Sequence, residues 1–257
     1  MRRRVITALL FAASASAVWL RAAPEPAASQ RTVYLIGEGV AEADIVAVSA
    51  ALAGGGKPGV LLLDSPRAEA VVKPFLARYR PDRVVAVGNF PGGIDAVEQR
   101  WGVSRAVVSG IDPEPADYAR SLAGGTERVV VCPAAPAGLL LQAACLAGAL
   151  PAPLFVVRGA ERPPELEAFV TKHKPTEIIA VGAAAAACRG LPGVTALADE
   201  AAAARAHRRR LREAGPISAL VLANPADAAR LSALAPWVAL SHRAALVLTD
   251  PTGADAA

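Results

Sequence analysis

The feature that most constrains this chain of 257 residues is an internal repeat. Residues 80–88 match residues 174–182 without a gap, because both run from a basic residue and a proline into an apolar stretch that ends at glycine, 94 residues apart. A further match follows 92 residues on, where 244–251 repeats 152–159. A fixed period at separate landmarks indicates that one structural unit is used several times.

Each unit alternates strand-like and helix-like stretches. In the second copy, an apolar run at 128–132 precedes an Ala-rich stretch at 138–148. A second apolar run at 154–157 precedes a polar stretch at 164–174, and the copy ends with the apolar run 178–181. Strands that are apolar on both faces and alternate with helices are typical of a parallel sheet covered on both sides. The predicted fold class is α/β, built from repeated Rossmann-like modules with parallel sheets flanked by helices.

The repeat also divides the chain. We predict a signal peptide at 1–17, a Pro- and Ala-rich spacer at 18–30, and modules at 31–100, 101–190 and 191–257. The last module is incomplete, because the sequence stops before its final helix and strand. Such a truncated sheet would leave an apolar edge exposed. We therefore expect self-association, a downstream domain of a longer protein or another partner to cover it.

The first residues indicate export. Three arginines at 2–4 precede an apolar stretch at 5–13 and a small-residue cleavage pattern at 15–17. An uncleaved anchor is the alternative, because apolar residues continue through Leu20, although the run is short for a bilayer span of about 20 residues. We expect the protein in the cell envelope, the periplasm or outside the cell.

The charge balance does not indicate a nucleic-acid partner. The chain has 27 Lys and Arg against 23 Asp and Glu, and residues 1–17 hold three of the arginines and no acid, which leaves 24 against 23. One basic cluster remains on a helix-like stretch flanked by acids: Arg205, Arg208, Arg209 and Arg212. Its two interpretations are a solvated helix with internal ion pairs and a contact surface for an anionic polymer or lipid.

No catalytic or cofactor motif is visible in the sequence. Gly37 and Gly39 follow a predicted strand, but Glu42 stands where a dinucleotide fingerprint has its third glycine, and an acid there would repel a pyrophosphate. The three histidines lie far apart, without metal-ligand spacing. The three cysteines lie in apolar segments and are expected to be buried, with a bridge between the first two as the alternative: Cys132, Cys145 and Cys188. We expect no cofactor, no metal and no catalytic residue.

Candidate ligand-binding residues follow from the predicted sheet. In an open parallel sheet, ligands gather at the carboxyl ends of the strands. The polar residues at those predicted ends are Asp64, Ser65, Asn89, Arg158, Asn224 and Asp250. The alternative is that they are ordinary turn and cap residues.

The modules resemble the cell-wall-binding repeat 2 family of bacterial surface proteins, as about two and a half divergent repeats. In the first unit the similarity lies in the stretches at 43–52, 60–63 and 84–88, and in the second at 152–156 and 178–182. The sequence departs from the family in its helix aspartate, which is present as Asp44 but is replaced in the other two units: Gly138 and Arg230.

The resemblance implies a non-catalytic exported module that attaches a protein to an anionic polymer of the cell envelope. Two alternatives remain open from the sequence. In the first alternative, the chain is the N-terminal non-catalytic domain of a larger exported hydrolase or peptidase. In the second, it is a solute-binding domain that uses the clefts at the strand ends.

Overall fold

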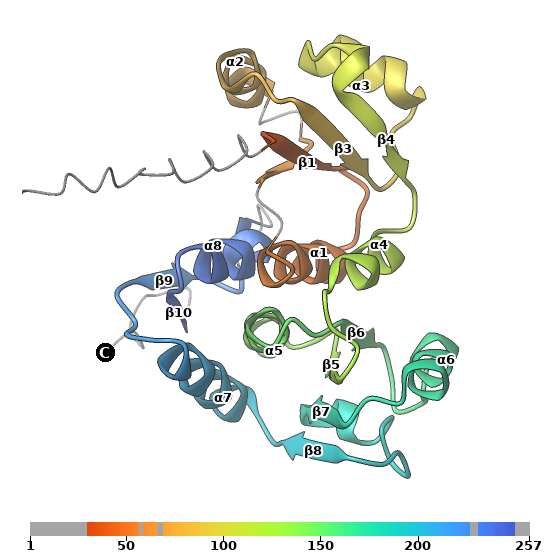
Figure 1. The fold of residues 1–257 in the computed structure, drawn as a ribbon, viewed down its shortest axis with the longest axis vertical. Coiled ribbons are helices and arrows are strands. Elements are labelled where there is room, and N and C mark those ends of the chain that lie inside the picture. Colours follow the sequence, from red (N-terminus) through yellow and green to blue (C-terminus); the bar gives the residue numbers. More distant parts are fainter. Residues whose placement is uncertain (1–29, 57–58, 66–68, 227–230, 250–257) are drawn as a thin grey trace, which may run out of the picture.

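The structure is a computed structural model, and it describes residues 30–56, 59–65, 69–226 and 231–249. The predicted signal peptide at 1–17 lies outside these ranges, as does the spacer except for its last residue. Among the described residues, no helix is long and apolar enough to cross a membrane. The predicted fold class is confirmed, because the described sheets are parallel and helices accompany them (Figure 1).

The first module is a four-stranded parallel sheet in the order β2-β1-β3-β4. Its strands are β1 (Thr32–Ile36), β2 (Val60–Leu63), β3 (Arg83–Val87) and β4 (Val108–Asp112). Its helices are α1 (Glu42–Gly54), α2 (Glu69–Tyr79), α3 (Gly93–Trp101) and α4 (Pro115–Leu122), with a 3₁₀ turn η2 (Arg105–Val107). One face of the sheet packs against α2 and α3, and the other packs against α1.

The second module repeats this topology as β6-β5-β7-β8. Its strands are β5 (Arg128–Pro133), β6 (Leu154–Val157), β7 (Glu177–Val181) and β8 (Val194–Leu197). Its helices are α5 (Ala137–Ala149), α6 (Pro164–His173) and α7 (Glu200–Glu213), and a 3₁₀ turn η3 (Gly182–Ala185) takes the place that α3 has in the first module. The internal repeat predicted from the sequence is therefore a repeat of strand order as well as of residues.

The third module has only two described strands, β9 (Leu220–Ala223) and β10 (Ala245–Leu248), which pair in parallel. Between them lie the 3₁₀ turn η4 (Leu231–Leu234) and helix α8 (Ala235–Ser241). These elements correspond to β5, α5 and β6 of the second module. The described part of the third module contains no counterpart of β7 or β8.

The boundaries predicted at residues 100 and 190 fall short of the observed modules. The segments that follow these boundaries contain β4 and β8, which pair with β3 and β7 of the preceding sheets. Helices α4 and α7 then pack back on α1 and α5. The strands are hard to recognise because both are half-exposed edge strands, so their sequences lack the continuous apolar pattern of β3 and β7.

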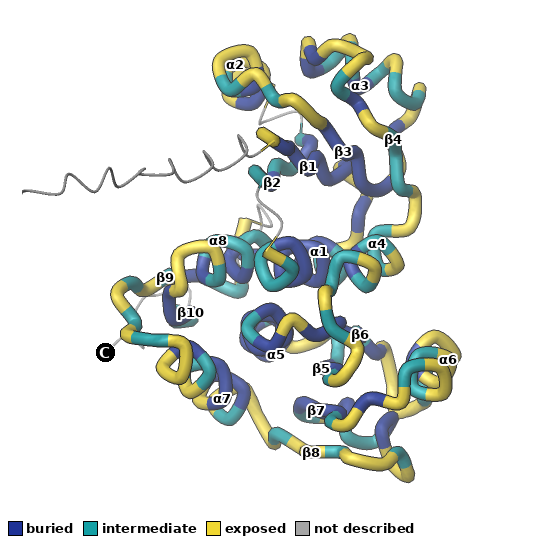
Figure 2. The backbone as a smooth tube through the Cα atoms, viewed as in Figure 1, coloured by how far each residue is buried: buried dark blue, intermediate teal, exposed yellow. Residues whose placement is uncertain are grey.

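The centre of the molecule is formed by the first helix of each module, because α1, α5 and α8 pack against one another (Figure 1). Figure 2 shows α1 and α5 buried along most of their length, as expected for helices that are apolar all round. Small residues allow this close packing: a Cβ atom on Gly54 would lie 2.5 Å from the carbonyl oxygen of Gly148. Two buried polar side chains also join the modules, since Ser49 Oγ donates to the carbonyl of Ala233 at 2.9 Å and Gln142 Nε2 donates to that of Leu246 at 3.1 Å.

Candidate functional site

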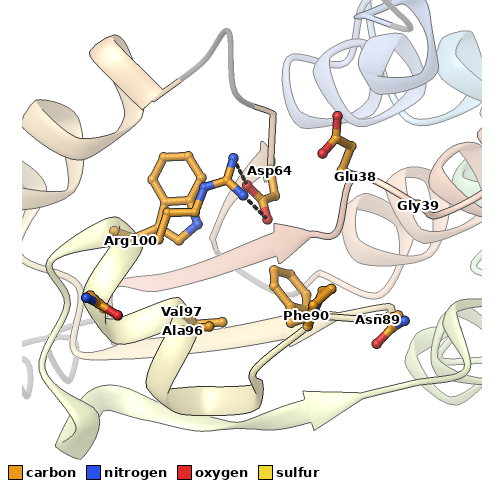
Figure 3. Close-up of a pocket in the computed structure, with 11 residues that line it drawn as sticks. Glu38, Gly39, Asp64, Asn89, Phe90, Ala96, Val97 and Arg100 are labelled. Atoms are coloured by element: carbon orange, nitrogen blue, oxygen red, sulfur yellow. Dashed lines mark hydrogen bonds and ion pairs between the residues drawn. The ribbon is translucent and has the colours of Figure 1, made fainter.

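A pocket of about 650 Å³ lies at the carboxyl ends of β1, β2 and β3 (Figure 3). It forms there because β1 lies between β2 and β3, so the loop after β1 leads to α1 on one face while the next two loops lead to helices on the other. These three loops and α3 provide its lining: Glu38, Gly39, Asp64, Asn89, Phe90, Pro91, Ala96, Val97, Gln99, Arg100 and Trp101.

The polar centre of this pocket is an ion pair between Asp64 and Arg100. The Nη2 atom of Arg100 lies 3.0 Å from Oδ1 of Asp64, and Nη1 lies 3.5 Å from Oδ2. Asp64 is buried, whereas a third of the Arg100 side chain remains exposed. Burial raises the pKa of Asp64, the Arg100 charge opposes that rise, and the charges of Glu38 and Glu69 add to it. Asp64 therefore holds Arg100 in place at some electrostatic cost.

Trp101 supports the guanidinium from beneath. The Arg100 guanidinium lies 5.0 Å from the centre of the Trp101 ring, within the range of a cation–π contact. Trp101 is only 1% exposed, and its Nε1 has no hydrogen-bond partner among the described residues. Around this pair, the exposed amides of Asn89 and Gln99 supply polar contacts, while Phe90 and Val97 supply apolar surface. The pocket can therefore receive a polar organic ligand with an apolar face.

The predicted ligand-binding residues lie in different modules of the structure. Asp64 and Asn89 both line the pocket of the first module, and Ser65 follows Asp64 outside its lining. Asn224 follows β9 and lines a separate groove in the third module. Asp250 lies outside the described residues. Each sheet has its own carboxyl edge, so residues at equivalent positions of three modules are held apart.

Arg158 follows β6 in the second module and acts across the boundary between modules. Burial raises the pKa of Asp44 on α1, and the charges of Arg158 and Arg120 oppose that rise. Arg120 also lies over the ring of Phe155, 5.2 Å from its centre. Arg158 therefore belongs to a charged cluster where the first two modules meet, away from the pocket.

Sequence reasoning missed the residues of the pocket that do not follow a strand. Arg100 and Trp101 lie at the end of α3, and their approach to Asp64 depends on how that helix packs on the sheet. The only signal in the local sequence is an arginine followed directly by a tryptophan, and this pair by itself does not predict a site. Glu38 could have been found by the strand-end rule, because it comes two residues after β1.

Helix α7 carries the predicted arginine cluster. Its buried face packs against α5, which leaves three arginines exposed at helical spacing on the other side: Arg205, Arg209 and Arg212. Arg208 is half-buried between the two faces. None of these four forms an ion pair with a described residue, whereas Arg210 pairs with Glu213 at 2.9 Å. Asp199 caps the helix by accepting from the Ala202 N–H at 2.7 Å. The exposed stripe is therefore not neutralised by the acids at the helix ends.

The remaining reactive side chains do not form a site. Cys132, Cys145 and Cys188 are buried and free, so the Cys132–Cys145 bridge is not formed, and burial raises the pKa of all three thiols. Within the described ranges, no group of three or more His, Cys, Asp or Glu side chains could hold a metal ion.

The fold is similar to that of Cwp6 from Clostridium difficile, with a TM-score of 0.61 and 15% sequence identity. The similarity covers 87% of this chain and 38% of that protein, so the chain spans well under half of its length. No family model matches the sequence, and no curated protein is similar to it by sequence. At this level of identity the similarity establishes the fold alone.

Proposed function

We propose that this chain is a non-catalytic module that attaches an exported protein to an anionic polymer of the cell envelope. The fold of a cell wall protein supports an envelope role, and the sequence resemblance to cell-wall-binding repeats agrees with it. The observation that carries the choice of ligand is the stripe on α7, where Arg205, Arg209 and Arg212 are exposed and form no ion pair with a described carboxylate.

A polymer with regularly spaced negative charges fits this stripe physically. Residues four and three apart on a helix lie on one face, so the three guanidiniums follow one another along the axis. Guanidinium groups can bind carboxylate or phosphate oxygens in pairs. Because the stripe is exposed, its contacts would be screened over a distance of about 8 Å at physiological salt. Binding should therefore weaken steeply as salt is added.

The test is co-sedimentation of the chain with purified envelope material over a salt series. We expect retention at low salt that survives removal of protein from the material but not extraction of its polymers. Replacing Arg205, Arg209 and Arg212 with Gln should weaken retention about tenfold, which corresponds to about 0.5 kcal/mol for each exposed charge. Because all three positions are exposed, we expect the thermal stability of that variant to be unchanged.

The matched control removes the same number of positive charges from exposed positions on α2 and α6. Its substitutions are Lys73→Gln, Arg78→Gln and Lys172→Gln. If both triple variants lose retention equally, net charge rather than the α7 stripe determines binding. If the folded parent chain is not retained even at low salt, the anchoring function itself is contradicted.

A second candidate is a solute-binding domain, and the pocket beside Asp64 favours it. Its volume of about 650 Å³ is in the range of small-molecule sites, and its lining joins an ion pair, two amides and an apolar wall. Thermal unfolding in the presence of neutral sugars, acidic sugars and amino acids tests this candidate. A ligand at 100 times its Kd should stabilise the chain by about 2.7 kcal/mol, and Asp64→Ala should remove that stabilisation. The absence of any shift across these classes would contradict it.

A further inference from the structure

The first strand of the third module exposes side chains that the other two modules bury. Leu220 and Leu222 of β9 are 66% and 64% exposed. Both lie on the face turned away from α5 and α8, because Val221 and Ala223 between and after them contact the central core. The residues on the corresponding face of β1 and β5 are at most 1% exposed: Val33, Leu35, Val129 and Val131.

The difference arises because the described part of the third module has neither a second strand beside β9 nor the helices that cover the outer face of the other two sheets. β1 lies between β2 and β3, and β5 lies between β6 and β7, whereas β9 pairs with β10 alone in the part of the chain that the structure describes. Figure 1 shows β9 and β10 at the edge of the molecule, beside α8. One side of β9 therefore presents backbone N–H and C=O groups that no described strand pairs.

A groove of about 340 Å³ lies beside β9, and residues of β9, η4 and α8 line it while those of β10 do not. Its lining residues come from β9, the residue after it, η4 and α8: Val221, Leu222, Ala223, Asn224, Leu231, Ser232, Leu234, Ala235 and Val238. Ser232 is 5% exposed, and its Oγ has no hydrogen-bond partner among the described residues. The groove is therefore largely apolar and retains an unused hydrogen-bonding group.

We propose that this groove binds an apolar β-strand of a partner polypeptide, which adds to β9 in parallel and completes the third sheet. The other modules provide the pattern, because β3 and β7 occupy the same place beside β1 and β5. Both begin with a charged residue, continue with two β-branched residues and end with Ala-Val. In both strands the last four residues are buried. We therefore expect the partner strand to begin with a charged residue, continue with two β-branched residues and end with Ala-Val.

A helix before the strand is part of the same partner. In the second module, Leu166 of α6 packs with Ile178 and Ala180 of β7 over the outer face of β5. The corresponding face of β9 is the one that exposes Leu220 and Leu222. An amphipathic helix followed by an apolar strand would bury these leucines together.

The parallel pattern favours this occupant over a second copy of the chain. Every strand pairing in the described sheets is parallel. Two copies related by a twofold axis would bring β9 against β9 in the antiparallel sense, with a different spacing of backbone hydrogen bonds.

The chain itself supplies a probe for the test. A fluorescent peptide of residues 163–182 contains α6 and β7, and it can be titrated onto the whole chain while its anisotropy is followed. We expect saturable binding by a monomeric chain and slower amide exchange in β9 when the peptide is present. Leu222→Lys should weaken binding by about tenfold or more, because a charge would be buried under the helix. A peptide with Ile178→Lys should lose affinity similarly.

Val71→Lys is the matched control, because Val71 on α2 is 71% exposed and lies in the first module. Both lysine variants should fold as the parent does. Lack of saturable binding, or equal affinity of the Leu222→Lys and Val71→Lys chains for the peptide, would overturn the proposal. A chain that forms dimers which Leu222→Lys dissociates would also overturn it, because a second copy would then occupy the groove.

Discussion

His207 should make the stability of this protein depend on pH in a direction that the structure fixes. The side chain lies on the face of α7 that packs against α5, and it is fully buried. Neither ring nitrogen has a hydrogen-bond partner among the described residues. Burial, together with the charge of the neighbouring Arg208, lowers the pKa of His207 to about 4. The folded protein therefore holds a neutral imidazole well below the pH at which a free one is charged.

The direction of this pH dependence follows from which state of the protein, folded or unfolded, binds the proton. Between pH 6.5 and 4 the unfolded chain protonates His207 and the folded chain does not, so acidification favours unfolding. The contribution to stability is complete above about pH 6.5 and is lost as the pH falls toward 4. With pKa values of about 6.5 unfolded and 4 folded, the loss is about 1.4 kcal/mol at pH 5.5 and about 2.6 kcal/mol at pH 4.5.

Urea unfolding of the parent chain and of His207→Leu between pH 7.5 and 4.5 measures this contribution. The leucine variant removes the titrating group but keeps an apolar side chain of similar length. Subtracting the two profiles removes the effect of buried carboxyls such as Asp64, whose raised pKa acts in the opposite direction. We expect the difference in unfolding free energy to change by about 1.4 kcal/mol from pH 7.5 to 5.5. Parallel profiles over this range would refute the assignment of a neutral, buried His207.

Two further predictions concern the packing of the central helices. Gly148→Val should destabilise the protein by about 3 kcal/mol, because even a Cβ atom there would lie 2.9 Å from the Ala50 carbonyl of α1; Gly124→Ala, which has open space, should change the melting temperature little. Ser49→Ala should cost about 1–2 kcal/mol because it leaves a buried carbonyl unpaired, whereas Ser121→Ala at an exposed helix position should cost less than about 0.5 kcal/mol. Chemical denaturation measures all four, and equal stability within either pair would contradict the packing described.

Much of the fold was predictable because its inner strands carry a strong local signal. β3 and β7 are apolar at every buried position, and the copies share a fixed spacing. The predicted boundaries at residues 100 and 190 separated the edge strands β4 and β8 from their sheets, because a strand with one exposed side needs fewer apolar residues. Their membership of the preceding sheets depends on pairing with residues that are distant in sequence.

The candidate site was predictable only in part, for a related reason. The strand-end rule found Asp64 and Asn89, since both follow a strand directly. It could not find Arg100, because the contact between that arginine and Asp64 is made by the packing of α3 against the sheet. It also selected Arg158 and Asn224, which lie at the strand ends of the other two sheets.

The sequence by itself determined the α/β class and the repeat, because these depend on local apolar patterns and on their spacing. Only the tertiary structure decided which faces remained available. Packing of α7 on α5 buries His207 and leaves the arginine stripe outside, and Leu222 is exposed because no described helix covers the outer face of β9. A local pattern cannot specify these outcomes, because burial depends on what lies opposite a residue in space.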